Sequence, residues 1–217
     1  MAMDGLNLFA SGREIARLTG GKIDKIHQPE KDELVLLVRA GGENHRLLLC
    51  ANPSQARAQL TDCKRANPLE APAFCMLLRR RIAGGRILAV EQPHMDRVLE
   101  ITIEAQNELG DLVPYKLIAE IMGKYSNIIL TDENGRILDA IRRVGPGMSS
   151  VRVILPGQAY MPPPAQDKRD AREATAAQIA AVFMAGRVDK ALSAAFFGLA
   201  TGLGYPIGGH IADRGPA

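Results

Sequence analysis

Two short stretches of the sequence combine side chains that can bind nucleic acid. The first is Asp96-Arg97, which follows Pro93 and precedes an apolar run that begins at Val98. A carboxylate beside a guanidinium can hold the planar arginine fork for bidentate contact with a phosphate or a guanine base. The alternative is an exposed ion pair, which contributes little free energy. The spacing of these residues alone favours the ion pair.

The second stretch lies between two apolar runs that are typical of β-strands. Gly123 can adopt a backbone conformation that other residues resist, so it can open a short polar link. Lys124 offers a cation to a phosphate, and Tyr125 offers a ring that can stack on a base. An ordinary polar hairpin turn is the alternative, and the residues alone favour it. The residues of this stretch are Glu120, Ile121, Met122, Gly123, Lys124, Tyr125, Ser126 and Asn127.

Other charged residues bear on the same chemistry. Glu120 must be paired or solvated, because an acid that ends an apolar strand is costly to bury alone. Clusters of arginine can form a phosphate-binding surface, although a run of charge is more commonly a solvated face. We take the arginines near residue 80 as candidate phosphate contacts. The clusters are Arg79, Arg80 and Arg81, then Arg86, then Arg142 and Arg143.

The sequence contains none of the common signatures of catalysis. There is no phosphate-binding P-loop, no dinucleotide-binding motif after a predicted strand, and no Gly-x-Ser-x-Gly nucleophile elbow. The four histidines are scattered, and the three cysteines (Cys50, Cys63 and Cys75) have no Cys-x-x-Cys spacing. We therefore expect a protein that is not an enzyme and that needs no metal or cofactor. The cysteines are expected to be buried thiols in a reducing compartment.

The composition is ordinary for a globular protein and sets limits on its partners. The 217 residues carry a net charge of +3 and a pI near 8.8, with 47% hydrophobic and 24% charged residues. So weak a positive charge is compatible with an RNA partner without arguing for one. The N-terminus lacks the apolar segment of a secretory signal, and no stretch approaches the roughly 20 apolar residues of a membrane span. We expect a cytoplasmic protein without a membrane partner.

The elements that position these residues follow from hydrophobic periodicity. Helical spacing of apolar residues over positions 4–18 predicts a first helix, with Asp4 as its N-cap. A second helix is expected to begin at Pro72 and to end at Gly84-Gly85. The polar, proline-containing residues 52–70 predict a long loop between them. Strands are expected at 22–27, 33–39, 46–50, 87–92, 98–105, 116–122, 127–131 and 137–141.

These elements predict an α+β fold, a two-layer antiparallel β-sandwich with flanking helices. Its last hairpin is expected at Asn134-Gly135, a strong hairpin signal. The sandwich is expected to occupy residues 1–145. Proline and glycine over 146–172 predict a linker, and alanine-rich segments over 173–217 predict a small helical unit. The glycines at its end fit helix-hairpin-helix turns, which present backbone N–H groups to phosphate. The alternative is a simple helix pair, which is the more common structure for a glycine-rich helical tail.

The order of these segments resembles the N-terminal domain of the NFACT family of ribosome-associated quality-control proteins, some of which are named as fibronectin-binding proteins. The resemblance covers residues 3–145 and rests on many separated segments. Asp96-Arg97 and residues 120–127 look like the two signature motifs of the family. Residues 202–214 more loosely resemble its helix-hairpin-helix segment. The other matching segments are residues 3–5, 20–29, 31–34, 44–49, 52–57 and 72–79.

The resemblance implies a fold similar to the N-terminal domain of the formamidopyrimidine-type DNA glycosylases, followed by a helix-hairpin-helix unit. Full-length members also carry a coiled coil and a further RNA-binding domain, which we expect to be absent here. The bacterial members bind the large ribosomal subunit with a stalled peptidyl-tRNA and recruit alanyl-tRNA to extend the nascent chain with alanines. We therefore expect Asp96, Arg97 and residues 120–127 to form one tRNA-binding surface. Arg79, Arg80 and Arg81 are expected to assist on phosphates.

Two other functions compete with tRNA binding. Base excision by glycosylase chemistry needs an amino-terminal proline nucleophile beside a glutamate, and this chain begins Met1-Ala2-Met3-Asp4. A DNA-binding, glycosylase-like domain without activity is the variant that remains. A fibronectin-binding adhesin would need export, for which the sequence offers no signal. The sequence favours binding of tRNA and the ribosome.

Overall fold

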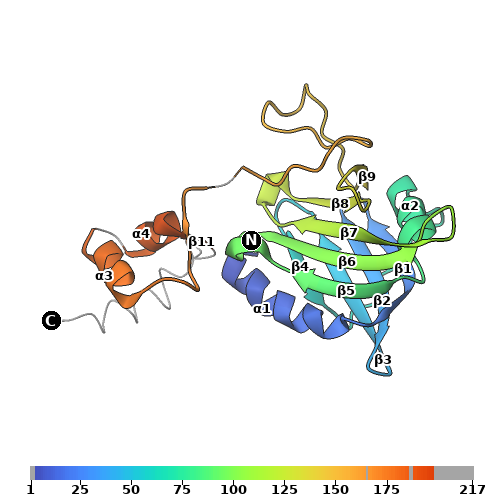
Figure 1. Ribbon diagram of the computed structural model, residues 1–217, viewed down its shortest axis with the longest axis horizontal. Helices are drawn as coiled ribbons and strands as arrows, with labels where there is room; N and C mark the ends of the chain where they lie inside the picture. Colours follow the sequence, from blue (N-terminus) through green and yellow to red (C-terminus); the bar gives the residue numbers. More distant parts are fainter. Residues whose placement is uncertain (1–2, 165, 186–187, 198–217) are drawn as a thin grey trace.

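The computed structural model of the chain describes residues 3–164, 166–185 and 188–197. Most of them form one antiparallel sheet of nine strands in the order β4-β3-β2-β1-β5-β6-β7-β8-β9. Figure 1 shows β5, β6 and β7 crossing in front of β2 and β3, so the sheet folds back on itself into two layers. The strands are β1 (Lys22–Glu30), β2 (Glu33–Ala40), β3 (Glu43–Cys50), β4 (Arg57–Leu60), β5 (Arg86–Glu91), β6 (Val98–Gln106), β7 (Leu112–Glu120), β8 (Asn127–Thr131) and β9 (Ile137–Ala140).

The sheet passes from one layer to the other where β1 meets β5. This pairing is short: Lys22 lies opposite Arg86, and the backbone N–H of Ile23 donates to the carbonyl of Gly85 at 2.9 Å. A Cβ atom at Gly85 would lie 2.8 Å from the carbonyl oxygen of Glu104 on β6. Glycine is therefore required here because the two backbones approach more closely than a side chain allows.

Helices pack against the sandwich at its open sides. α1 (Gly5–Ile15) contacts β4, β5 and β6, and α2 (Ala73–Ile82) contacts β1, β6 and β9. The side chain of Asp4 caps α1 as expected, accepting the N–H of Asn7 at 2.7 Å. Short 3-10 turns follow at η1 (Ala16–Leu18), η2 (Pro93–Met95) and η3 (Gly123–Tyr125). The helical side chains buried in the main core are Leu8, Ile15, Phe74, Cys75, Leu78 and Ile82.

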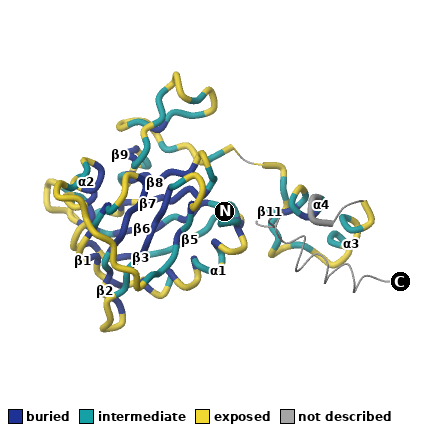
Figure 2. Tube along the Cα trace, turned by 180° about the vertical axis from the view of Figure 1, so that it is seen from behind, coloured by how far each residue is buried: buried dark blue, intermediate teal, exposed yellow. Residues whose placement is uncertain are grey.

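A second, smaller core lies on the other face of β6–β9. Residues 144–161, which we call the strap, cover it. The strap is held to itself by paired bonds between Val144 and Ile154 (2.9 and 2.8 Å), and to β9 by the bond from Ile137 N–H to the Gln158 carbonyl at 2.8 Å. Figure 2 shows the strap as the loop above β8 and β9. The buried residues of this core are Val98, Ile118, Ile129, Ile137, Ala140 and Ile154.

Beyond the strap, the described chain forms a small, mainly helical unit. It contains β10 (Arg169–Asp170), α3 (Ala176–Met184), α4 (Val188–Ala195) and β11 (Phe196–Phe197), and β10 pairs in parallel with β11. A capping box between Thr175 and Gln178 begins α3. Both helices agree with the helical segment predicted after residue 173. Residues 202–214, predicted as a helix-hairpin-helix segment, lie outside the described residues.

The α+β sandwich with flanking helices agrees with the sequence prediction, with three local differences. Residues 57–60, predicted as loop, form β4, because Ala58 completes the core and the backbone pairs with the edge of β3. The first half of the segment predicted as linker forms the strap, because the apolar outer face of β6–β9 needs a cover. Cys63 is exposed, contrary to expectation, whereas Cys50 and Cys75 are buried.

The close approach at the β1–β5 junction can be tested by Gly85→Ala. The added methyl would meet backbone and side-chain atoms at 2.8 to 3.0 Å. We expect the free energy of unfolding to fall by about 1–3 kcal/mol, as is usual for overpacking. Urea denaturation measures this. Gly147→Ala is the matched control, because no atom lies within 4 Å of its Cβ; it should change stability by less than about 0.5 kcal/mol. Equal losses in the two variants would contradict the account of the junction.

Candidate nucleic-acid interface

The register of β6 and β7 brings the two sequence stretches side by side. Val98, the first residue of β6, lies opposite Glu120, the last residue of β7. The pairing continues one step further, because the N–H of Ile121 donates to the carbonyl of Arg97 at 2.8 Å. Asp96-Arg97 and residues 120–127 therefore meet at one end of the same hairpin, as the proposal of a single surface requires.

The turn that delivers Asp96 has an unusual backbone. His94 and Met95 have φ angles of 48° and 58°, which lie in the left-handed region that side chains other than glycine disfavour. Burial of Met95 and the hydrogen bonds of Gln92 offset this strain. The side chain of Met95 is only 2% exposed, and the Gln92 amide donates both to the Asp96 carbonyl at 2.7 Å and to the Gly5 carbonyl of α1 at 2.9 Å. Strained turns held in this way are common at binding sites.

The side chains of Asp96 and Arg97 do not pair with each other within the described residues. The Asp96 carboxylate instead accepts the backbone N–H of Arg97 at 2.6 Å. The predicted alternative of an exposed ion pair is therefore wrong. In the described part of the chain the half-buried Arg97 guanidinium makes no hydrogen bond or ion pair, so its donors remain available to a ligand.

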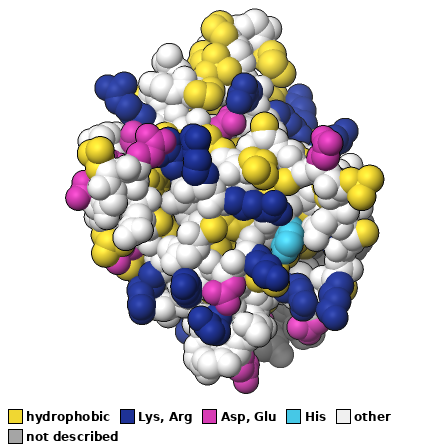
Figure 3. All heavy atoms as spheres, turned by 90° about the vertical axis from the view of Figure 1, so that its right-hand side faces the viewer, with side chains coloured by type: hydrophobic (Ala, Val, Ile, Leu, Met, Phe, Trp, Pro, Cys, Tyr) yellow, Lys and Arg dark blue, Asp and Glu magenta, His cyan; other side chains and the backbone are white. Residues whose placement is uncertain are grey.

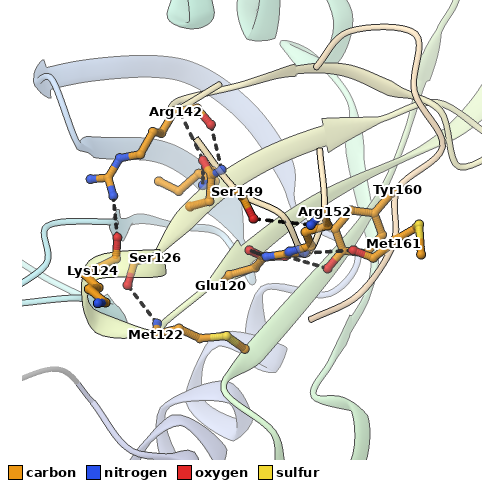
Figure 4. Close-up of polar contacts among 11 residues, drawn as sticks. Glu120, Met122, Lys124, Ser126, Arg142, Ser149, Arg152, Tyr160 and Met161 are labelled. Atoms are coloured by element: carbon orange, nitrogen blue, oxygen red, sulfur yellow. Dashed lines mark hydrogen bonds and ion pairs between the residues drawn. The ribbon is translucent and has the colours of Figure 1, made fainter. Parts of the chain in front are cut away.

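The polar link after β7 presents a cation and an aromatic ring to solvent. Gly123 begins the η3 turn with φ 58°, which fits its predicted role. The Lys124 ammonium lies 4.9 Å from the centre of the Tyr125 ring, and Tyr125 is 68% exposed. The Ser126 hydroxyl closes the turn by accepting the N–H of Met122 at 2.8 Å (Figure 4). The exposed ring can stack on a base while the ammonium meets a phosphate.

Asn127 ties this turn to the chain that follows β9. It is 1% exposed, and its amide donates to the Arg142 carbonyl at 2.8 Å and accepts the Arg142 N–H at 3.1 Å. The Arg142 guanidinium in turn donates to the Lys124 carbonyl at 2.9 Å. Next to this contact, Lys31, Asp32, Ile141 and Arg142 line a cleft of about 250 Å³. Buried amides of this kind fix a loop conformation rather than bind a ligand.

Glu120 is the most deeply buried charge at this end of the sandwich. Its side chain is 0% exposed and points to the strap side of the sheet. The Arg152 guanidinium, only 11% exposed, holds both carboxylate oxygens, one of them at 2.7 Å. The Tyr160 hydroxyl donates to Glu120 Oε1 at 2.9 Å (Figure 4). The strap thus supplies the partner that Glu120 was expected to need. The sequence did not indicate which residue this partner would be.

Burial of this cluster changes the acidity of Tyr160. Burial raises the pKa of its hydroxyl far above the ordinary value, and the negative charge of Glu120 raises that pKa further. Tyr160 therefore remains a hydrogen-bond donor to Glu120 throughout the ordinary pH range. A neutral donor and a guanidinium together satisfy the carboxylate, so the buried charge is stabilised without solvent.

Most of the predicted site residues thus fall into three groups. Glu120, Ile121, Ser126 and Asn127 are buried, and their polar side-chain groups bind other parts of the chain. Arg97, Lys124 and Tyr125 combine accessible surface with the chemistry to contact a ligand. The α2 arginines form the third group: Arg81 pairs with Glu108 at 2.9 Å, in the hairpin loop at the opposite end of β6 and β7. Arg79 donates from Nε to the Ile26 carbonyl at 2.8 Å.

The described residues also bear on metals and membranes. They contain no group of three or more His, Cys, Asp or Glu residues placed to hold a metal ion. None of the helices in the described ranges has the length and apolar character that a membrane span needs.

Comparison with known sequences connects this chain to one family. A sequence model described as "NFACT N-terminal and middle domains" matches residues 4–204. The chain is 43% identical over 203 residues to the Rqc2 homolog RqcH of Bacillus subtilis (strain 168), covering 92% of this chain and 36% of that protein. Its identity to the Rqc2 homolog RqcH of Streptococcus pneumoniae (strain D39) is 42% over 169 residues, covering 77% and 31%. The chain thus spans about a third of the length of these curated relatives.

Solved structures share the fold closely. The N-terminal domain of the fibronectin-binding protein PavA from Streptococcus pneumoniae has a TM-score of 0.90 and 36% identity, covering 97% of this chain and 80% of that one. The fibrinogen-binding protein from Staphylococcus aureus has a TM-score of 0.83 and 34% identity, covering 99% and 75%.

The buried ion pair predicts a large effect of Arg152→Ala. The variant leaves the Glu120 carboxylate buried without its cation, and we expect the free energy of unfolding to fall by about 3–5 kcal/mol. Arg39→Ala is the control, because Arg39 also pairs with an acid, Asp24, but the two side chains are 59% and 36% exposed; its cost should stay below about 1 kcal/mol.

Chemical denaturation compares the two variants. If Arg152→Ala does not fold, the double variant Glu120→Gln/Arg152→Met removes both charges and should recover a folded protein. Similar small losses for Arg152→Ala and Arg39→Ala would contradict the pairing.

The raised pKa of Tyr160 predicts a stability change in alkali. Because the folded-state pKa lies above the unfolded value of about 10, the stabilisation is complete below that pH and is lost as the pH rises above it. In Tyr160→Phe, stability should fall less steeply with pH, by up to about 1.4 kcal/mol per pH unit.

Urea denaturation at a series of alkaline pH values measures this slope. Tyr125→Phe, at an exposed tyrosine, is the control for the loss of a phenolic hydroxyl. An unchanged slope in Tyr160→Phe would show that the Tyr160 hydroxyl titrates normally.

Proposed function

The chain belongs to the NFACT family, and on this premise we propose that it is a non-catalytic RNA-binding module of a ribosome-associated quality-control factor. The names of its relatives, Rqc2 homologs RqcH, support that role. The proposed partners are tRNA and the large ribosomal subunit carrying peptidyl-tRNA. The proposed activity of the whole protein is to recruit alanyl-tRNA for C-terminal alanine tailing of stalled chains. Cytoplasmic localisation belongs to the same proposal.

The observation that carries the proposal is the pairing of the two sequence stretches across β6 and β7. The Ile121 N–H bond to the Arg97 carbonyl sets the two stretches on one edge. That edge offers a guanidinium, an ammonium and an exposed ring, from Arg97, Lys124 and Tyr125. Cations that position a nucleic-acid backbone, together with a ring that stacks on an unpaired base, are the usual means of binding single-stranded RNA loops.

The buried residues of the two stretches support this surface from behind. Glu120 anchors the end of β7 to the strap, and Asn127 anchors the start of β8 to Arg142. Asp96 fixes the backbone of Arg97. In this proposal these residues position the contact residues rather than touch RNA. A loop held at both ends loses less conformational entropy when it binds, which strengthens binding.

Protein binding is the second candidate. Two solved relatives are named for binding fibronectin or fibrinogen, so this fold can be associated with an extracellular protein ligand. A cation beside an exposed aromatic ring also suits a protein interface. RNA binding is preferred because the basic and aromatic groups gather at the sequence stretches that resemble the signature motifs of a ribosome-associated family.

The proposal also covers the organisation of the chain. We assign residues 1–145 to the sandwich, 146–172 to the connection and 173–217 to the helical unit, with the strap as the ordered first half of the connection. Similarity of the sandwich to the glycosylase N-terminal domain, and a helix-hairpin-helix in the last unit, remain parts of this proposal.

Binding of labelled tRNA tests the proposed function. The double variant Arg97→Ala/Tyr125→Ala should bind tRNA at least about tenfold more weakly, because it loses a phosphate contact and a base stack. The control Arg39→Ala removes an arginine that is 59% exposed and pairs with Asp24 on the other layer; it should bind almost as the wild type does. Fluorescence anisotropy at several salt concentrations gives both affinity and salt dependence.

The competing outcomes are distinct. Unchanged tRNA affinity in the double variant would remove this surface from the mechanism. Absence of tRNA binding by the wild type, together with saturable binding of fibronectin, would favour the second candidate. Co-sedimentation with large ribosomal subunits adds a second readout, in which the double variant should pellet less than Arg39→Ala.

A further inference from the structure

A cavity at the far end of the sandwich is lined by arginines. It measures about 630 Å³ and lies between the end of α2, the start of β5 and the β6–β7 hairpin. β6 has nine residues, so at about 3.4 Å per residue its two ends are roughly 27 Å apart. The cavity is therefore separate from the surface at Arg97 and Tyr125. Its lining includes Arg80, Arg81, Arg86, Gly84, Gly85 and Glu104.

The arginines of this cavity have donors that the described chain does not use. The guanidinium of the exposed Arg80 makes no hydrogen bond or ion pair within the described ranges. Arg81 holds Glu108 through Nη2 at 2.9 Å, but its Nε is buried and has no hydrogen-bond partner among the described atoms. Arg86 makes one bond, from Nη1 to the Gly20 carbonyl at 3.3 Å. A buried donor without an acceptor is costly, so the described chain leaves Arg81 incompletely satisfied.

Glycines keep the cavity open beside these donors. Gly84 has φ 81° and only the Cε atom of Lys22, at 4.0 Å, near the position of a Cβ. A side chain at Gly84 would add bulk to the lining, next to the Lys22 side chain. The acid of the lining is Glu104, which lies opposite Arg86. In the hairpin loop next to the cavity are Glu108, which pairs with Arg81, and Asp111, which contacts Asn107. The balance of charge in the lining is positive.

Lys and Arg side chains are spread over the face of the molecule that carries this end. Figure 3 views the side of Figure 1 on which α2 lies, and dark blue side chains are distributed across it. Arginine forks bind phosphate oxygens in a bidentate manner. A cavity of several hundred cubic ångströms has room for more than one phosphate group.

We propose that Arg80, Arg81 and Arg86 form a second anion site that binds adjacent phosphate groups, at the opposite end of the sandwich from the tRNA-binding surface. The phosphates come either from an RNA backbone or from a free polyphosphorylated molecule. The RNA source rests on the proposed function, whereas the phosphate chemistry does not. With an RNA source, one module contacts its ligand at two places roughly 27 Å apart.

Inorganic tripolyphosphate tests the phosphate chemistry directly. Isothermal titration should show saturable binding to the wild type, and Arg80→Ala/Arg86→Ala should weaken it at least about tenfold, because charge-assisted hydrogen bonds are lost. Arg13→Ala/Arg39→Ala is the control, because it removes the same charge from exposed positions outside the cavity; it should change affinity less than about twofold. Circular dichroism checks that both variants are folded. No saturable binding by the wild type, or equal binding by both variants, overturns the site.

Labelled tRNA distinguishes the two sources of phosphate. With an RNA source, the slope of log affinity against log salt should become shallower by about 1–2 in Arg80→Ala/Arg86→Ala, since each phosphate contact contributes about 0.7–0.9. An unchanged slope, together with lost tripolyphosphate binding, would support the site and assign it to a free phosphorylated ligand. Tripolyphosphate binding without any tRNA binding by the wild type would reject the proposed function and retain the anion site.

Discussion

Burial of the Glu120 carboxylate constrains everything around the two signature stretches. A charge that is 0% exposed must have partners, and in this chain they are Arg152 and Tyr160. Both partners belong to the strap, so the ion pair fastens the strap to the last residue of β7. The neighbouring residue, Ile121, continues the pairing to Arg97. The end of β7 therefore makes two connections. Glu120 holds the strap, and Ile121 holds the backbone of Arg97.

The alternation of β7 explains why one residue can do this. Leu117 and Ala119 face the main core, whereas Ile118 and Glu120 face the strap. The strap covers the apolar side chains of this face and pairs with the carboxylate of Glu120 next to the polar turn. Loss of the Glu120–Arg152 ion pair would leave a buried carboxylate without a cation and would loosen the strap over the second core. The stability of this face and the position of the turn are therefore coupled. The supporting residue Glu120 thus lies a few residues before the turn that presents Lys124 and Tyr125.

Local signals predicted much of the fold. The Asp4 cap, the strand alternation and the Asn134-Gly135 turn each depend on residues close in sequence, and the structure has all three. The strap was predicted as linker because it is rich in proline and glycine. Its few buried residues have partners far away in sequence, so no local pattern marks them. Arg152 is 32 residues from Glu120. The only sequence signal for it was indirect: an acid at the end of an apolar strand needs a partner, but sequence does not say which. Within the site, sequence identified the right stretches, whereas burial was needed to separate contact residues such as Tyr125 from supporting residues such as Asn127.

The edge formed by Arg97 and the turn at Lys124-Tyr125 is the RNA-binding surface that we propose. Nuclear magnetic resonance titration of the isotopically labelled chain with tRNA can test this residue by residue, because each backbone amide reports separately. We expect saturable shifts of the amide signals of Arg97, Lys124 and Tyr125, with little change at Gly41 and Gly42 in the hairpin between β2 and β3. Saturable shifts that leave Arg97, Lys124 and Tyr125 unchanged would contradict it.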